Sequence, residues 1–345
     1  MDRQNIKALD HDQLVQELAN LKQPKFRAAQ IEQWLWSKHA RSFDEMTNLP
    51  KSLREVLAQK FFLPFPTVLT RQVSKDGTRK YLVGFEDGTA VETVGIPSKD
   101  GTRLTVCFST QAGCTMGCVF CATGRGGFTR NLASHEMYDQ IVVVSQDFEK
   151  RVTNVVAMGQ GEPFANYDAV LAALRLMNNE SYLNIGARHI TVSTCGIIKG
   201  IERFTCEPEQ FTLAVSLHAA IQQTRDDLMP GTRPYPLKHL RSSLVSYSET
   251  TRRRPTFEYA LIEEVNDTDA HLAALVNFAQ GMLCHINLIA LNPIDKDDDP
   301  SKMRPSSRIH LFEREISKHG IEVSIRDSRG ADIDGACGQL RQNVE

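Results

Sequence analysis

The first 62 residues carry apolar side chains at helical spacing. In residues 26–40, FRAAQIEQWLWSKHA, large side chains recur at the period of one helix face. Leu49-Pro50 interrupts this pattern, and residues 51–62, KSLREVLAQKFF, resume it. The pattern predicts a small helical accessory module over residues 1–62. One face of its segment 26–40 is predicted to hold Phe26, Ile31, Trp34, Leu35 and His39.

A hairpin signal follows this module. Residues 79–97, RKYLVGFEDGTAVETVGIP, contain two runs rich in β-branched and aromatic side chains. Glu86-Asp87-Gly88 lies between them and is typical of a tight turn. We therefore expect a β-hairpin in a linking segment over residues 63–100.

From residue 104 onward, short β-branched runs alternate with helical segments. The runs are LTVCFS (104–109), NVVAM (154–158), HITVST (189–194), FTLAVSL (211–217), TFEYALI (256–262) and HINLIAL (285–291). Six strand–helix repeats predict an α/β fold, namely a parallel (β/α)6 barrel or part of one, over residues 101–328. A seventh run, 321–327, leads into a glycine-rich tail over residues 329–345. In such barrels the site lies at the carboxyl ends of the strands.

Composition places this fold among ordinary globular proteins. Of the 345 residues, 41% are hydrophobic and 24% are charged. No apolar run reaches the roughly 18–20 residues that span a bilayer, and the first residues lack the apolar core of a signal peptide. We expect a cytoplasmic protein without a membrane partner. There, the eight cysteines are expected to act as ligands, reactive thiols or core residues rather than as disulfide staples.

The net charge of −2 weighs against a protein that coats nucleic acid by bulk electrostatics. A local basic face remains compatible with it, although a solvated surface is the commoner explanation of such charges. The candidates are Arg79, Lys80, Arg125, Arg130, Arg188 and residues 252–254.

Three cysteines follow the first predicted barrel strand in GCTMGCVFCATG, residues 113–124. Cys114, Cys118 and Cys121 have the spacing C-x3-C-x2-C. Closely spaced thiolates hold iron–sulfur clusters, and three ligands on four irons leave one iron open to a substrate or cofactor. Structural zinc usually takes four ligands in pairs, and no second pair has the required spacing. The loop therefore favours an iron–sulfur cluster over zinc.

This motif resembles that of the radical S-adenosylmethionine (SAM) superfamily. Six further segments narrow the resemblance to the RlmN/Cfr family of RNA adenosine methyltransferases, and together the seven cover nearly the whole chain. The segment that contains the cysteine motif is CFSTQAGCTMGCVFCATGRGGFTRNL (107–132). The six others are MGQGEP (158–163), VSTCGI (192–197), AVSLHA (214–219), EYALIEEVND (258–267), NLIALNP (287–293) and GADIDGACGQL (330–340).

The resemblance implies a partial (β/α)6 radical SAM barrel with an N-terminal helical accessory domain and a C-terminal catalytic tail. It implies methylation of carbon 2 of an adenosine in 23S rRNA, at the peptidyl transferase centre, and of the adenosine 3′ of the anticodon in tRNAs. Relatives use one [4Fe-4S] cluster and two SAM molecules per turnover. One SAM methylates a cysteine, and the other yields a 5′-deoxyadenosyl radical that activates this methyl group.

Site residues follow from the same resemblance. Cys114, Cys118 and Cys121 match the cluster ligands. Cys337 matches the methyl-carrying cysteine and Cys107 the cysteine that resolves the enzyme–RNA cross-link. Without the resemblance, Cys107 would be interpreted as a core residue.

Glu92, in VETVGIP, matches the glutamate that acts on the adenine, as proton acceptor or base-edge contact. The family's usual MGMGEP is MGQGEP in this chain, so Gln160 replaces a methionine near the SAM pocket. The SAM contacts of the family match Gly161, Glu162, Ser193, Ser216, Leu217, His218 and Asn292.

Three alternatives remain open at this point. A carbon-8 methyltransferase of the Cfr type is one, although GGFTRNL and RPYPL (233–237) look more like the carbon-2 branch. Methylthiolation usually needs a second cluster, and the chain has no second cysteine triplet. A zinc- or cluster-bearing RNA-binding protein without catalysis would have no use for Cys337.

The implied partners are 23S rRNA, tRNA and an external one-electron reductant such as flavodoxin, and we expect a monomer. The target base must leave its stack to enter a barrel mouth. RNA contacts are expected from the N-terminal module and the arginines at 252–254.

Overall fold

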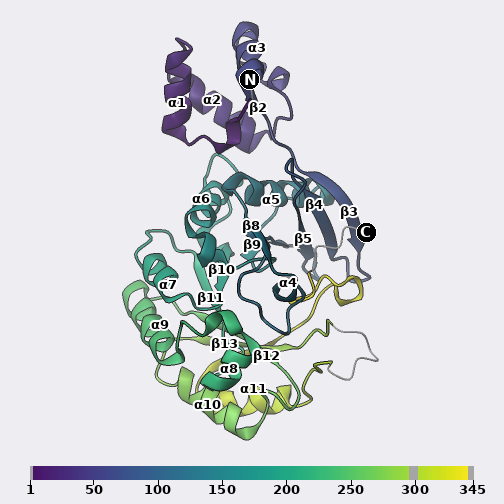
Figure 1. Ribbon diagram of the computed structural model, residues 1–345, viewed down its shortest axis with the longest axis vertical. Coiled ribbons are helices and arrows are strands. Elements are labelled where there is room, and N and C mark those ends of the chain that lie inside the picture. Colours follow the sequence, from purple (N-terminus) through teal and green to yellow (C-terminus); the bar gives the residue numbers. More distant parts are fainter. Residues whose placement is uncertain (1–2, 295–301, 341–345) are drawn as a thin grey trace.

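A computed structural model describes residues 3–294 and 302–340 of the chain. It shows a small lobe of N-terminal helices above a larger α/β body (Figure 1). Residues 1–2, 295–301 and 341–345, which belong to the predicted module, core and tail respectively, lie outside the described residues.

The N-terminal lobe contains three helices and a two-stranded parallel sheet. Asp10 caps the first helix in a capping box with Gln13. The helix predicted over 26–40 ends earlier, in a π-helical turn at Gln33–Ser37, and His39 follows with a φ of 53°. Phe26 is 56% exposed, so the predicted apolar face is wrong at its first residue, whereas the His39 ring lies against Tyr138. The elements are β1 (Gln4–Asn5), α1 (His11–Asn20), α2 (Phe26–Glu32), α3 (Lys51–Lys60) and β2 (Phe61–Phe62).

A buried ion pair joins this lobe to the body. Lys7 Nζ lies 2.7 Å from a carboxylate oxygen of Asp139, and both side chains are almost fully buried. Asp139 belongs to α5 (Ser134–Phe148), as does His135, whose Nε2 lies 3.0 Å from the Asn5 amide. One helix of the body therefore receives the polar contacts of the lobe's first residues.

One ten-stranded sheet organises the body, in the order β14-β13-β12-β11-β10-β9-β6-β5-β4-β3. Its first seven strands are mutually parallel. They are β6 (Leu104–Cys107), β9 (Asn154–Ala157), β10 (Ile190–Thr194), β11 (Thr212–Ser216), β12 (Thr256–Leu261), β13 (His285–Ala290) and β14 (Glu322–Arg326). The remaining three continue the sheet as an antiparallel meander: β3 (Thr67–Val73), β4 (Arg79–Gly84) and β5 (Ala90–Pro97).

Helices follow the parallel strands along the chain, and β14 comes last. Val155, Val192, Leu213 and Ile286 are fully buried, as expected for parallel strands covered by helices. The predicted six strand–helix repeats, the seventh strand and the hairpin at residues 86–88 are thereby confirmed. The helices are α5, α6 (Tyr167–Asn178), α7 (Ile198–Thr205), α8 (Gln222–Leu228), α9 (Leu237–Thr251), α10 (Asp269–Ala279) and α11 (Ile309–Lys318). Within the described ranges, no helix combines the length and apolar character that a membrane crossing requires.

Three short elements interrupt the first repeat. The loop after β6 forms a small antiparallel pair, β7 (Gln111–Gly113) with β8 (Phe128–Asn131), and between them the one-turn helix α4 (Ala122–Arg125). The three closely spaced cysteines lie between β7 and α4. The sequence pattern did not predict this pair.

The C-terminal tail crosses the carboxyl ends of the strands. It first contacts the turn between β3 and β4, where the Gly330 amide donates to Asp76 (3.1 Å) and Ser74 Oγ donates to Asp332 (2.5 Å). It then reaches α4, where the Ala122 amide donates to the Gly338 carbonyl (2.7 Å). The tail therefore lies over the cysteine loop.

Replacing Lys7 by methionine should lower the melting temperature, since Asp139 loses its partner in a buried site. Burial already raises the pKa of the Asp139 carboxyl, and loss of Lys7 raises it further. Wild type and variant both lose stability as the pH rises above the ordinary carboxyl pKa of about 4, because the folded state holds this proton more tightly than the unfolded chain does. The variant goes on losing stability above the folded-state pKa of the wild type, so its deficit is larger at the higher pH.

Thermal unfolding at about pH 5 and about pH 8 measures this effect. Lys60→Met is the control, because it breaks a partly exposed ion pair with Glu17 in the same lobe. Equal losses for the two variants at both pH values would contradict the assignment of Lys7 as the anchor of the lobe.

Candidate functional site: two adjoining cavities under the tail

Two cavities adjoin at the carboxyl ends of the parallel strands. We name them the inner cavity, next to the cysteine loop, and the tail cavity, between β14 and the tail. Asn292, Arg326 and Cys337 belong to the walls of both. The inner cavity brings together the predicted residues Cys114, Cys118, Cys121, Gly161, Glu162, Ser193, Ser216, His218, Asn292 and Cys337. Predicted residues from distant parts of the sequence thus share one site.

The cysteine loop directs its three thiols to the inner cavity. Gly124 permits the tight fold of the loop, because a Cβ there would lie 2.8 Å from both the backbone nitrogen and the oxygen of Cys118. In the part of the chain that the structure describes, no three His, Cys, Asp or Glu side chains are grouped to hold a single metal ion. In a four-iron cluster each thiolate binds a separate iron, so the sulfurs need not converge on one point. The donor set of three thiols on one cavity wall fits such a cluster.

The GQGEP segment forms another part of this wall. Gly161 has a φ of 103°, and a Cβ there would lie 2.6 Å from the Cβ of Gln111, so only glycine fits. The Glu162 carboxylate is buried and accepts hydrogen bonds from the amides of Phe164 (2.9 Å) and Cys195 (2.6 Å). Burial raises the pKa of Glu162, whereas the bond from Cys195 opposes this rise. The carboxylate is therefore held in place before any ligand arrives.

Side chains at the ends of β10, β11 and β13 complete the inner cavity. Ser193 and Ser216 lie with their Oγ atoms 3.4 Å apart. His218 Nδ1 accepts from the Ala260 amide (3.0 Å), which leaves the proton on Nε2. Burial lowers the pKa of His218 to about 3, so the ring is neutral. Leu217 does not line either cavity, because its side chain is fully buried in the core.

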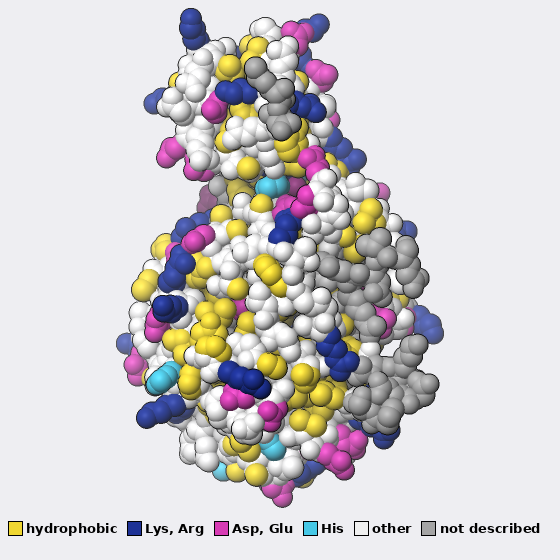
Figure 2. Space-filling view, in the orientation of Figure 1, with side chains coloured by type: hydrophobic (Ala, Val, Ile, Leu, Met, Phe, Trp, Pro, Cys, Tyr) yellow, Lys and Arg dark blue, Asp and Glu magenta, His cyan; other side chains and the backbone are white. Residues whose placement is uncertain are grey.

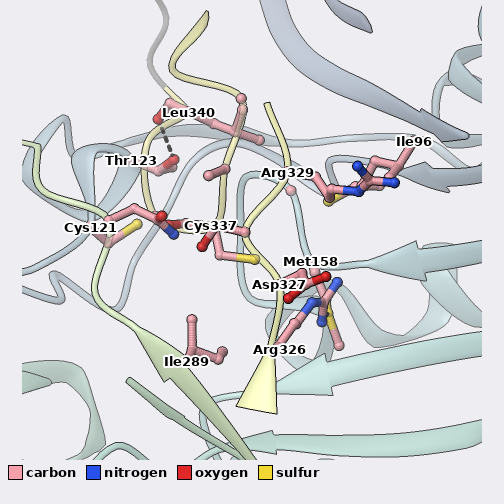
Figure 3. Close-up of a pocket in the computed structure, with 17 residues that line it drawn as sticks. Ile96, Cys121, Thr123, Met158, Ile289, Arg326, Asp327, Arg329, Cys337 and Leu340 are labelled. Atoms are coloured by element: carbon pink, nitrogen blue, oxygen red, sulfur yellow. Dashed lines mark hydrogen bonds between the residues drawn. The ribbon is translucent and has the colours of Figure 1, made fainter. Parts of the chain in front are cut away.

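Cys107 and Cys337 line the tail cavity together. Figure 3 shows Cys337 and Arg326 on the same side of this cavity, near Met158. Asn292 donates to the Cys337 carbonyl (3.2 Å) and thereby fixes this part of the tail. Burial raises the pKa of Cys107 to about 12, and the neighbouring Cys337 adds to this rise while Arg326 opposes it. Cys107 is therefore a thiol rather than a thiolate in this arrangement.

Glu92 lies on β5, beside the cavities rather than in their walls. Its carboxylate is buried and pairs with Lys80 Nζ at 3.0 Å. Lys80 Nζ also donates to the carbonyl of Asp334 in the tail (3.3 Å). The positions of the glutamate and the tail are thus linked through one lysine.

Three titratable residues of the inner cavity were not among the predicted site residues. The first is Cys195, which lines this cavity with Cys118, whereas Cys206 is exposed and Cys284 is buried. Its place directly after β10 was the available signal. Glu258 and Arg326, at β12 and β14, gave no comparable signal, because single charged residues are common at strand ends.

The arginines at 252–254 do not border the cavities. They precede β12, at the opposite end of the parallel strands, where they surround a separate basic pocket with Arg188. Arg79 and Arg130 are paired with acidic side chains. On the face shown in Figure 2, Lys and Arg are interspersed with Asp and Glu rather than gathered in one patch.

Two family models match separate parts of the chain. The family described as "Ribosomal RNA large subunit methyltransferase N-terminal domain" matches residues 4–63. The "Radical SAM superfamily" matches residues 108–230, which include the cysteine loop and the GQGEP segment.

Similar proteins extend the match over the whole chain. "Probable dual-specificity RNA methyltransferase RlmN" of Clostridium novyi is 44% identical over 340 residues, covering 98% of each chain. Its counterpart in Pelotomaculum thermopropionicum is 45% identical over 347 residues, covering 99% of this chain and 93% of that protein. A crystal structure of a radical SAM methyltransferase from Sphaerobacter thermophilus has a TM-score of 0.90 at 43% identity, over 98% of this chain and 99% of the other. The chain therefore belongs to the RlmN family of radical SAM RNA methyltransferases.

Proposed function

We propose that this enzyme methylates carbon 2 of adenosine in 23S rRNA and in tRNA. The observation that carries the proposal is the meeting of Cys107 and Cys337 in one cavity that adjoins the three-cysteine cavity. The matched domain description names large-subunit ribosomal RNA, and the relatives' name specifies dual-specificity RNA methylation. The first supports a ribosomal RNA substrate, and the second supports a second kind of RNA.

Cys114, Cys118 and Cys121 are proposed to hold a [4Fe-4S] cluster. Of the predicted SAM contacts, those that line the inner cavity are proposed to bind SAM, namely Gly161, Glu162, Ser193, Ser216, His218 and Asn292. When bound, these cofactors supply the methyl group, the electron and the 5′-deoxyadenosyl radical. Gly161 allows close backbone approach, and the Glu162 carboxylate suits the ammonium group of SAM. His218 offers a neutral N–H donor, because its other ring nitrogen is already bonded.

Cys337 is proposed to carry the methyl group. Its thiolate would take the methyl group of one SAM: a C–S bond forms, the bond from the methyl carbon to the SAM sulfur breaks, and S-adenosylhomocysteine leaves. Transfer of a hydrogen atom from this S-methyl group to the 5′-deoxyadenosyl radical would leave a carbon radical that adds to C2 of the adenine. The adduct would then give up one electron, for which the oxidised cluster is the proposed acceptor, and the C2 proton, for which Glu92 is the proposed acceptor.

Cys107 is proposed to release the product. Its thiolate attacks the Cys337 sulfur, the bond between this sulfur and the methylene carbon breaks, and the methylene group takes a proton to become the methyl. The two thiols end as a disulfide, which an external reductant must reopen. Because Cys107 is buried and protonated in the described arrangement, movement of the tail must precede this step.

The domain organisation and the partners of the enzyme are also part of the proposal. We infer an accessory domain over residues 1–62, a linker over 63–100, a core over 101–328 and a tail over 329–345. The accessory domain is proposed to contact RNA, and the enzyme to act as a cytoplasmic monomer. A one-electron donor such as flavodoxin is proposed to reduce it.

Mass spectrometry of nucleosides tests the function. Anaerobic enzyme is incubated with SAM, reductant and unmodified ribosomal RNA or tRNA. We expect 2-methyladenosine from the wild type and none from Cys337→Ala, whereas Cys206→Ala, which removes an exposed thiol elsewhere, keeps full activity. Formation of 8-methyladenosine would replace the carbon-2 assignment, and equal product from Cys337→Ala would refute the relay.

Alkylation rates test the thiol states. At about pH 8, a group with a pKa of about 12 is a thiolate in only about one molecule in 10⁴. With iodoacetamide and peptide mapping of the reduced enzyme without SAM, Cys337 should be labelled orders of magnitude faster than Cys107. Buried Cys284 provides a slow reference. Labelling of Cys107 as fast as that of Cys337 is incompatible with the buried resting thiol.

A further inference from the structure

Arg225, on α8, is fully buried without an acidic partner at hydrogen-bond distance. Its Nη1 donates to the carbonyls of Leu217 and Ser216 (3.1 Å for the latter), and its Nη2 donates to the Cys195 carbonyl (2.6 Å). A further contact goes to the Met229 sulfur (3.6 Å). Nε has no hydrogen-bond partner among the described residues. All of these partners are electrically neutral, so the guanidinium charge is left uncompensated by its contacts.

The segment that carries Arg225 packs directly on the cysteine loop. The Val119 amide donates to the Leu228 carbonyl (3.0 Å), and the Gly231 amide donates to the Met116 carbonyl (2.9 Å). Met116, Cys118, Phe120, Leu228 and Met229 form one buried apolar cluster, with Cys114, Cys121 and Cys195 packed against it. Charges in such surroundings interact strongly, because water does not screen them.

Two carboxylates lie in the neighbourhood, and each already has other partners. Asp226 accepts from the Gln222 side chain (2.8 Å) on the same helix. Glu162 is linked to Arg225 only through the backbone of Cys195. The Cys195 amide donates a hydrogen bond to the Glu162 carboxylate, and Arg225 donates one to the Cys195 carbonyl. Burial of an unpaired cation costs several kcal/mol unless an anion lies close by. The charge of Arg225 would be compensated by a buried anion on the cavity side of the cysteine loop.

We propose that Arg225 is the positioning counter-ion of the [4Fe-4S] cluster and raises its reduction potential. Three thiolates outweigh the positive charge of an oxidised four-iron core, so the assembly is anionic, and reduction adds one more negative charge. A fixed buried cation favours the more negative state, and local charge is among the factors that set cluster potentials. The inference rests on the cluster site of the proposed function, not on the identity of the RNA.

Redox titration followed by electron paramagnetic resonance tests this role in reconstituted enzyme without SAM or RNA. Arg225→Met and Arg225→Gln remove the charge, and the glutamine keeps a donor for one carbonyl. Arg225→Lys keeps the charge. Arg241→Met is the matched control, because Arg241 also binds two carbonyls, those of Phe278 and Gln280, between α9 and α10. We expect a more negative midpoint for both neutral variants, a midpoint close to wild type for the lysine variant, and no change for Arg241→Met.

A second measurement keeps the proposal falsifiable if the neutral variants hold the cluster poorly. The rise in melting temperature on cluster reconstitution should be smaller in Arg225→Gln than in wild type, since only the loaded protein gains from the charge. Unchanged midpoints, together with equal losses of melting temperature in the cluster-free and loaded forms, would make Arg225 a purely structural link and overturn the proposal. Absence of 2-methyladenosine would leave these results unaffected, so the two proposals fail separately.

Discussion

Parallel strands end at the same edge of a sheet, and the chemistry of this protein depends on that alignment. The cysteine loop follows β6, GQGEP follows β9, Cys195 follows β10 and His218 follows β11. No two of these segments are neighbours in sequence, yet they enclose one cavity. The same edge explains why the tail, which leaves from β14, needs only a short path to bring Cys337 to Cys107.

Burial holds two of the proposed reactive groups, Cys107 and Glu92, in inactive states. Cys107 is protonated, Glu92 is paired with Lys80, and the tail is fastened at both the β3–β4 turn and α4. Such an arrangement protects the Cys107 thiol from side reactions, and it requires a movement before turnover. Lys80 contacts both Glu92 and the tail, so a displacement of the tail also changes the surroundings of this carboxylate.

The strands of the body could be predicted within about two residues, because buried parallel strands need nearly continuous β-branched runs. β3 could not, since TVLTRQV is exposed along its whole length and shows no alternation between a buried and a solvent face. The β7–β8 pair depends on a close backbone contact, in which a Cβ at Gly113 would lie 2.1 Å from the Gly127 oxygen. Such contacts arise from the folded loop and leave little trace in hydrophobic periodicity.

The site, too, has parts that the sequence predicts and parts that only the folded structure reveals. The cysteine spacing and the segment order were visible in the sequence, whereas Arg225 lies in QQTRDDL, which looks like an ordinary surface helix. Its burial follows from packing against the cysteine loop and the ends of β10 and β11. The role of a charged residue therefore depended on its neighbours in space, which the pattern did not reveal.

Most of the proposed chemistry depends on Cys337 as the carrier of the methyl group. Peptide mass spectrometry of the cluster-loaded enzyme after incubation with deuteromethyl-labelled SAM, without RNA, tests this role. We expect one labelled methyl group on the peptide that contains Cys337, and none on those containing Cys107 or Cys206. A methyl group on another residue, or labelled RNA product formed while Cys337 stays unmodified throughout, would contradict it.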